Sequence, residues 1–215
     1  MTASATRATS AKPSAMARPK AIAIGASAGG PEALATLFQS LTGCDIPVPI
    51  FLVLHMPADF SAMVAAYIER ISGRPTSPAT DGLPPLPGHI YVAPSGRHLR
   101  LSGRPSRALM RLDDGDSENF CRPAADVLFR SAAATYGHGL LALVLTGTGQ
   151  DGLAGSAAVA AAGGTVIAQD ESSSAAWGMP GAVIEHGYAS MVLPITVMGP
   201  KIASLFHAPE PGRAT

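Results

Sequence analysis

Residues 21–30 read Ala-Ile-Ala-Ile-Gly-Ala-Ser-Ala-Gly-Gly, and this stretch decides the fold. Its apolar first half predicts a buried strand, and the segment that follows, with Pro31 at an early helical position, predicts a helix. Between them, residues 25–29 fit the Gly-x-Ser-x-Gly turn, in which a serine hydroxyl is held out on a tight strand-to-helix connection. Small neighbours suit this turn because it leaves no room for bulk. The stretch therefore predicts a βα unit that presents Ser27 as a nucleophile, beside helix amides that favour an oxyanion.

Two other interpretations of the same stretch remain open at this point. A chain with 23 glycines can form a glycine-rich βα turn that carries no chemistry. The spacing Gly25-x-Ser27-x-x-Gly30 also resembles a dinucleotide-binding fingerprint, but serine replaces the glycine that lets the backbone approach a pyrophosphate. The second apolar run, residues 50–54, ends in His55 rather than in an acidic residue that would bind a ribose. A nucleotide-binding domain is therefore the weakest alternative.

The composition indicates one globular domain in a reducing compartment. A length of 215 residues with 47% hydrophobic content is enough for a single α/β domain. The 15 basic and 15 acidic residues cancel, so we expect no nucleic-acid partner. No apolar run is long enough for a membrane span or a secretory signal, which predicts a cytoplasmic protein without membrane insertion. Cys44 and Cys121 are too few for a disulfide framework, so we expect two reduced thiols.

The alternation of short apolar runs with longer helical patterns predicts a three-layer, doubly wound α/β fold with a mostly parallel sheet. We expect a flexible tail over 1–19, the domain over 20–207 and a second tail over 208–215. The predicted strands are 21–24, 50–54, 140–145, 165–168 and 189–193. The predicted helices are 31–41, 61–71, 123–136, 152–162, 180–186 and 195–206. Around Pro94-Ser95-Gly96, the runs 89–93 and 97–101 predict a hairpin that forms an antiparallel edge.

Three polar residues are expected to meet at one edge of this sheet. Ligands of open α/β sheets bind at the carboxyl ends of the strands, where Ser27, His55 and Asp151 follow three of the predicted strands. Imidazole can accept the serine proton and a carboxylate can orient the imidazole. Each residue also has a structural explanation, such as a hydrogen-bonded histidine or an aspartate that caps the next helix. The order Ser, His, Asp argues against an α/β-hydrolase, in which the acid precedes the histidine.

These blocks resemble the catalytic domain of CheB, the chemotaxis protein-glutamate methylesterase. The similar segments are 25–30, 55–57, 86–94, 121–129, 145–152 and 177–180, within a resemblance that spans about Lys20 to Phe206. The resemblance implies that Ser27 is the nucleophile, His55 its general base and Asp151 the orienting acid. It implies γ-glutamyl methyl esters on the cytoplasmic helices of chemoreceptors as substrates, with glutamine deamidation as a second activity of some members. This chemistry needs no metal or organic cofactor.

Two departures from the family pattern lie beside the predicted site. Ala28 stands where the family usually has threonine, and Thr148 stands where it usually has methionine. A backbone amide at residue 28 survives the first change and can still bind an oxyanion. Arg122 and Met179 are the other candidate substrate- or oxyanion-binding residues that the resemblance implies. His89, His98 and Cys121 lack compact metal-ligand spacing, so we expect no metal site.

Regulation and function class stay open in the sequence. The residues before the first predicted strand are too few for the receiver domain that usually precedes this domain. We therefore expect no control by phosphorylation in cis, and a signalling-protein regulator is a candidate partner. A catalytically silent partner-binding domain of the same fold is the alternative function, because Ala28 and Thr148 could mark lost activity.

Overall fold

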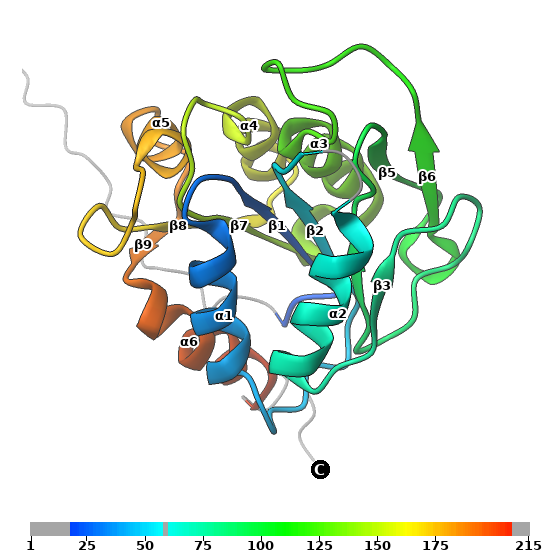
Figure 1. The fold of residues 1–215 in the computed structure, drawn as a ribbon, viewed down its shortest axis with the longest axis horizontal. Coiled ribbons are helices and arrows are strands. Elements are labelled where there is room, and N and C mark those ends of the chain that lie inside the picture. The colour runs from blue at the N-terminus through cyan, green and yellow to red at the C-terminus, as the bar shows by residue number, and fades with distance from the viewer. Residues whose placement is uncertain (1–17, 58–59, 208–215) are drawn as a thin grey trace, which may run out of the picture.

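The computed structural model describes residues 18–57 and 60–207, and its centre is a seven-stranded sheet in which all neighbouring strands run parallel. The strand order is β3-β4-β2-β1-β7-β8-β9. These strands are β1 (Ala21–Ala26), β2 (Ile50–Leu54), β3 (Thr76–Pro78), β4 (Ile90–Val92), β7 (Leu140–Val144), β8 (Thr165–Gln169) and β9 (Met191–Leu193). Helices cover both faces of the sheet (Figure 1), which confirms the predicted three-layer, doubly wound fold.

The strand order reverses at β1, in the middle of the sheet. The chain first runs outward from β1 to β2 and later returns to the other side of β1 as β7. Parallel strands have their carboxyl ends at one edge, and a reversal of this kind opens a crevice there. The residues that follow β1, β2 and β7 therefore lie together at this edge.

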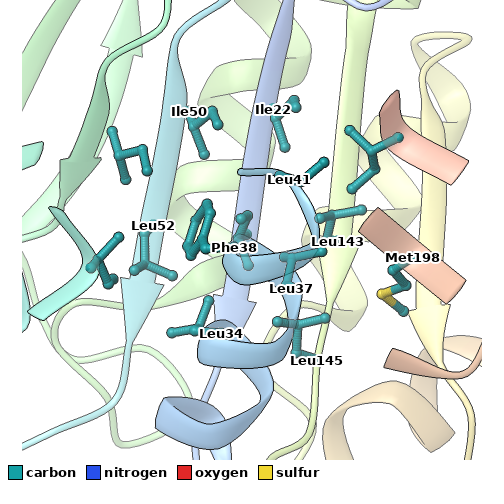
Figure 2. Packing of buried hydrophobic residues seen from close by; sticks show 14 of the residues in the cluster. Ile22, Leu34, Leu37, Phe38, Leu41, Ile50, Leu52, Leu143, Leu145 and Met198 are labelled. Carbon is teal, nitrogen blue, oxygen red and sulfur yellow. The ribbon is translucent and has the colours of Figure 1, made fainter. Parts of the chain in front are cut away.

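Three helices cover the first face of the sheet, namely α1 (Gly30–Ser40), α2 (Ser61–Ser72) and α6 (Ile195–His207). The apolar side chains of α1 recur three and four residues apart, so they form one stripe along the helix. Figure 2 shows this stripe, Leu34, Leu37 and Phe38, over Ile22 of β1 and its neighbours in the sheet. Burial of the stripe fixes α1, and with it the turn that contains Ser27.

The second face is covered by α3 (Ala125–Tyr136), α4 (Leu153–Ala161), α5 (Gly178–Glu185) and a separate antiparallel pair, β5 (His98–Ser102) with β6 (Leu109–Asp113). The β1 residues on this face are small, so α3 approaches the strand closely. A Cβ atom on Gly25 would lie only 2.7 Å from the Cβ of Ala125. This close approach brings the first turn of α3 to the carboxyl edge of the sheet.

The predicted hairpin around Pro94-Ser95-Gly96 has the wrong strand pairing. The run 89–93 contains β4, which lies between β2 and β3 in the parallel sheet. The run 97–101 overlaps β5, which pairs with β6 outside that sheet. The physical reason is burial, because every residue of β4 is buried, as an inner parallel strand requires. The predicted antiparallel pair is thus present, but the partner of β5 in it is β6 and not the run 89–93.

The other predicted strands and the six predicted helices are present, with ends that differ by at most two residues. The sequence interpretation missed β3 and β6. Residues 1–17 and 208–215 of the predicted tails lie outside the described residues. Within the two described ranges, no helix has the length and apolar character needed to cross a membrane.

Candidate active site

Ser27 and His55 follow neighbouring strands in matching register. Ala26 of β1 pairs with Leu54 of β2, and the amide of His55 donates a hydrogen bond to the Ala26 carbonyl at 3.0 Å. The amide of Ser27 donates to the carbonyl of Thr146, just after β7, at 3.0 Å. The serine is therefore located where the ends of β1, β2 and β7 come together.

His55 and Asp151 form a shielded hydrogen bond. The Nε2 atom of His55 lies 2.8 Å from Oδ2 of Asp151, and the two side chains are only 13% and 2% exposed. A carboxylate can only accept, so Nε2 of the imidazole carries the proton of this bond. In the neutral ring the lone pair is then on Nδ1. The contact thus leaves Nδ1 as the atom of His55 that can act as a base.

Five donors saturate the carboxylate of Asp151. Besides His55 they are the backbone amides of Ala125, Asp126 and Gly152, at 2.6, 2.9 and 3.0 Å, and the side-chain amide of Asn119, at 3.2 Å. Two of these amides belong to the first turn of α3, where amides have no acceptor within the helix and favour negative charge. Burial opposes ionisation, but the bonds from His55 and from the α3 amides outweigh it and hold the pKa of Asp151 below its ordinary value. Asp151 therefore faces His55 as a carboxylate.

The side chain of Asn119 links Asp151 to a second buried carboxylate. Its Nδ2 atom donates to Oδ2 of Asp126 at 2.9 Å and to Oδ1 of Asp151 at 3.2 Å. Burial raises the pKa of Asp126 against the effect of a hydrogen bond from the Gly155 amide, and the charge of Asp151 raises it further. Asn119 thus places two donor hydrogens between groups that would otherwise repel each other, and this restrains the orientation of Asp151.

Cys121, rather than Ser27, lies beside the free nitrogen of His55. Its Sγ atom is 3.5 Å from Nδ1. Burial, together with the charge of Asp151, raises the pKa of the Cys121 thiol, so the sulfur stays protonated and can donate to Nδ1. Among the described residues, no hydrogen bond joins the hydroxyl of Ser27 to His55. The structure therefore pairs His55 with Asp151 directly and leaves Ser27 nearby without that bond.

The turn that carries Ser27 provides candidate oxyanion donors. The amides of Ala28 and Gly29 precede α1 and donate to no other residue in the described part of the chain. The hydroxyl of Thr146 holds the carbonyl of Ala28 at 2.9 Å. Gly29 has φ 76°, and a Cβ there would lie 2.5 Å from the side chain of Ala175. The turn is fixed, and its two free amides can stabilise negative charge on a carbonyl oxygen.

Thr148 and Met179 differ in their exposure to solvent. Thr148 is exposed on the loop between β7 and Asp151. Met179 is fully buried and packs next to Gly147, where an added Cβ would lie 2.4 Å from the Met179 sulfur and 2.7 Å from Cβ of Ser27. Met179 is thus part of the buried wall behind Ser27, and within the described ranges it forms no hydrogen bond with Ser27, His55 or Asp151.

Arg122 is exposed and is held by the connection between β6 and α3. One guanidinium nitrogen donates to the carbonyls of Asp114 and Gly115, at 3.1 and 3.0 Å. The structure therefore does not bring its guanidinium into hydrogen-bond contact with His55 or Asp151.

Besides Ala125 and Gly152, which contribute only backbone amides, three residues that contact His55 or Asp151 had no role in the sequence interpretation, namely Asn119, Cys121 and Asp126. A signal existed for Asp126, because an acidic residue in the first turn of a predicted helix marks its N-terminus. The other two lie on an irregular connection, where no periodic pattern indicates which way the side chains point.

Within the described residues, no group of three His, Cys, Asp or Glu side chains is arranged to hold a metal ion.

The chain is similar to known proteins in both sequence and fold. The "CheB methylesterase" family model matches residues 22–202. A protein-glutamate methylesterase/protein-glutamine glutaminase 1 of Rhodospirillum rubrum is 50% identical over 187 residues, which are 86% of this chain and 48% of the relative. A protein-glutamate methylesterase/protein-glutamine glutaminase of Nitrobacter hamburgensis is 45% identical over 188 residues, covering 87% of this chain and 49% of the relative.

A solved structure agrees in fold as well as in sequence. The crystal structure of the Thermotoga maritima CheB methylesterase catalytic domain superimposes with a TM-score of 0.83 at 38% identity, covering 87% of this chain and 98% of that chain. The chain spans about half the length of the curated relatives it matches. Because the family model covers most of the described domain, the chain belongs to the CheB methylesterase family.

Proposed function

We propose that this chain is a serine esterase that removes methyl groups from glutamate γ-methyl esters on chemoreceptors, and that it also deamidates glutamine side chains. The observation that carries the proposal is the buried 2.8 Å contact between His55 and Asp151 beside Ser27. Relatives named protein-glutamate methylesterase/protein-glutamine glutaminase support this substrate class. The partner is then a methylated cytoplasmic receptor helix, and the reaction takes place in the cytoplasm.

In the first stage, Oγ of Ser27 attacks the ester carbonyl carbon. As the new C–O bond forms, the serine proton passes to Nδ1 of His55, because Nε2 is bonded to Asp151. The ionised carboxylate stabilises the imidazolium, and the amides of Ala28 and Gly29 donate to the developing oxyanion. The bond to the methoxy group then breaks, and His55 returns the proton so that methanol leaves.

In the second stage, water attacks the acyl-enzyme ester. His55 accepts a proton from the water as the second tetrahedral intermediate forms, and it returns a proton to Oγ of Ser27 as the acyl bond breaks. The products are the free serine and a glutamate side chain. With glutamine as the substrate, the same first stage releases ammonia in place of methanol.

Cys121 is the competing nucleophile because it already contacts the base. Its thiol lies 3.5 Å from Nδ1 of His55, so Ser27 must take the place of the sulfur as the partner of that nitrogen. A thiol acts as a nucleophile in its ionised form, and the raised pKa of Cys121 disfavours that form. We therefore assign the nucleophile to Ser27, on the turn with free amides.

Methanol release from a methylated receptor fragment tests the assignment. We expect Ser27→Ala to lower the rate on the order of 10⁴-fold or more, because the covalent route is lost. Cys121→Ala is the matched control at the other position near His55, and we expect it to stay within about 10-fold of the parent. The opposite result for the two variants would transfer the nucleophile to Cys121. A parent protein that releases no methanol would favour the silent partner-binding domain.

A further inference from the structure

The turn at residues 118–121 departs from normal turn chemistry beside the candidate active site. The amide of Glu118 donates to the carbonyl of Cys121 at 3.0 Å, and the amide of Cys121 donates to the carbonyl of Glu118 at 2.9 Å. The central residues Asn119 and Phe120 have φ values of 52° and 62°, as a type I′ turn requires. Asparagine suits the first central position, but the second normally holds glycine. A phenylalanine there is strained.

No packing within the described chain compensates for this strain. The relative exposure of Phe120 is 104%, the highest among the large apolar side chains that the structure describes as exposed. The ring therefore stays in water, which is unfavourable for an apolar group of this size. Strained residues persist where the surrounding structure holds them, and they concentrate at functional sites.

The inner side of the turn is held firmly against the candidate active site. Asn119 donates to Asp126 and Asp151, and Sγ of Cys121 lies 3.5 Å from Nδ1 of His55. Glu118 forms an ion pair with Arg130 of α3, with a contact of 2.6 Å. Phe120 is consequently fixed next to a residue that contacts the base, while its own side chain points to solvent.

Two more exposed apolar side chains, Phe60 and Met63, lie at the start of α2, and we call them, together with Phe120, the apolar rim. Hydrogen bonds tie the chain segments that carry these side chains to one intervening loop. The amide of Ser95 donates to the hydroxyl of Ser61 at 2.8 Å, and the amide of Gly96 donates to the carbonyl of Arg122 at 3.0 Å. The start of α2 and the β6–α3 connection are thus both tied to the segment at residues 95 and 96.

We propose that Phe120 is a substrate-docking residue, whose ring packs against an apolar side chain of the helix that carries the scissile glutamyl ester. The inference rests on the proposed function. The apolar residue on the substrate is three or four positions from the ester, because those positions share one face of a helix. The closeness of Phe120 to the site argues for this occupant, since its neighbour Cys121 lies 3.5 Å from Nδ1 of His55 and a segment that presents an ester to Ser27 comes next to this turn. The ring is exposed to water in the folded chain, and docking of the substrate helix would bury it.

Paired peptides and a strain-relieving variant test this role. Both helical peptides carry one glutamate γ-methyl ester and no glutamine, and they differ only in having leucine or asparagine three and four positions away. We expect Phe120→Gly to lower the ratio of kcat/KM between the leucine and asparagine peptides by about 5- to 10-fold, mainly through KM. Phe120→Tyr keeps the ratio. Leu86→Gly, which removes an exposed side chain on a proline-flanked loop away from the rim, is the matched control and leaves the ratio unchanged.

Thermal unfolding separates docking from a folding defect. Glycine adopts positive φ without strain, so Phe120→Gly should melt at or above the temperature of the parent protein. A kcat/KM ratio between the two peptides that is unchanged in Phe120→Gly would overturn the proposal. So would light scattering that shows a dimer of the parent protein and a monomer of Phe120→Gly, because a second copy of the chain would then cover the ring. Failure of the parent to release methanol from either peptide would instead refute the proposed function.

Discussion

At the scale of single residues, Asp151 connects folding with the proposed chemistry. Its carboxylate accepts hydrogen bonds from His55, from the first turn of α3 and from Asn119. These donors come from three separate stretches of the chain. The group that orients the base therefore also ties the end of β2 to the β6–α3 connection and to α3.

Asp151→Asn should lower the free energy of unfolding by about 1–3 kcal/mol near pH 7, because an NH₂ group then faces one of the former donors. Since the pKa of Asp151 is lowered on folding, the native state binds the proton more weakly than the unfolded chain does. The stabilisation by the carboxylate is then complete above the unfolded pKa of about 4, and it is lost as the pH falls through the folded pKa.

Urea unfolding of the parent and of Asp151→Asn at about pH 7, 5 and 3.5 measures this dependence. We expect the difference between the two proteins to be similar at the two higher values and to shrink at the lowest. A difference that grows on acidification would mean that the folded state does not favour the ionised carboxylate.

At the scale of secondary-structure elements, the contact between β1 and α3 positions the site. Gly25 leaves space for Ala125, whose amide donates to Asp151 at 2.6 Å. A wider separation would move the first turn of α3 away from the carboxylate. The same strand thus carries the Ser27 turn at its end and sets the position of the helix that holds the acid.

Gly25→Ala should destabilise the fold by about 1–3 kcal/mol, because the added methyl group overlaps the side chain of Ala125. Esterase activity should fall as well, since the Ala125 amide moves away from Asp151. The double variant Gly25→Ala with Ala125→Gly restores the space, so it should recover part of the lost stability and part of the lost esterase activity. Urea unfolding measures the stability and methanol release measures the activity. A double variant that is no more stable and no more active than Gly25→Ala would show that the close approach of β1 and α3 does not cause these losses.

At the scale of the whole molecule, parallel topology explains why much of the site could be predicted. Apolar runs predicted β1, β2 and β7, and residues that follow parallel strands must lie at one edge. This places Ser27, His55 and Asp151 together without any knowledge of the loops. The roles of the three residues in catalysis stay predictions until they are measured.

Other parts of the molecule had no usable local signal. The three-residue strand β3, Thr76–Pro78, contains a serine and a proline and so lacks an apolar pattern. The pairing of β5 with β6 depends on burial against α3, which no local turn signal reveals. Asn119 and Cys121 reach the site from an irregular connection, so their contacts depend on tertiary structure alone.

The most direct test of the central claim is the location of a covalent adduct after reaction with a serine-directed fluorophosphonate. Peptide mass spectrometry of the full chain gives the modified residue. The account predicts one adduct, on Ser27, with labelling abolished in Ser27→Ala and slowed in Asp151→Asn. An adduct on Cys121 or the absence of any adduct would contradict it.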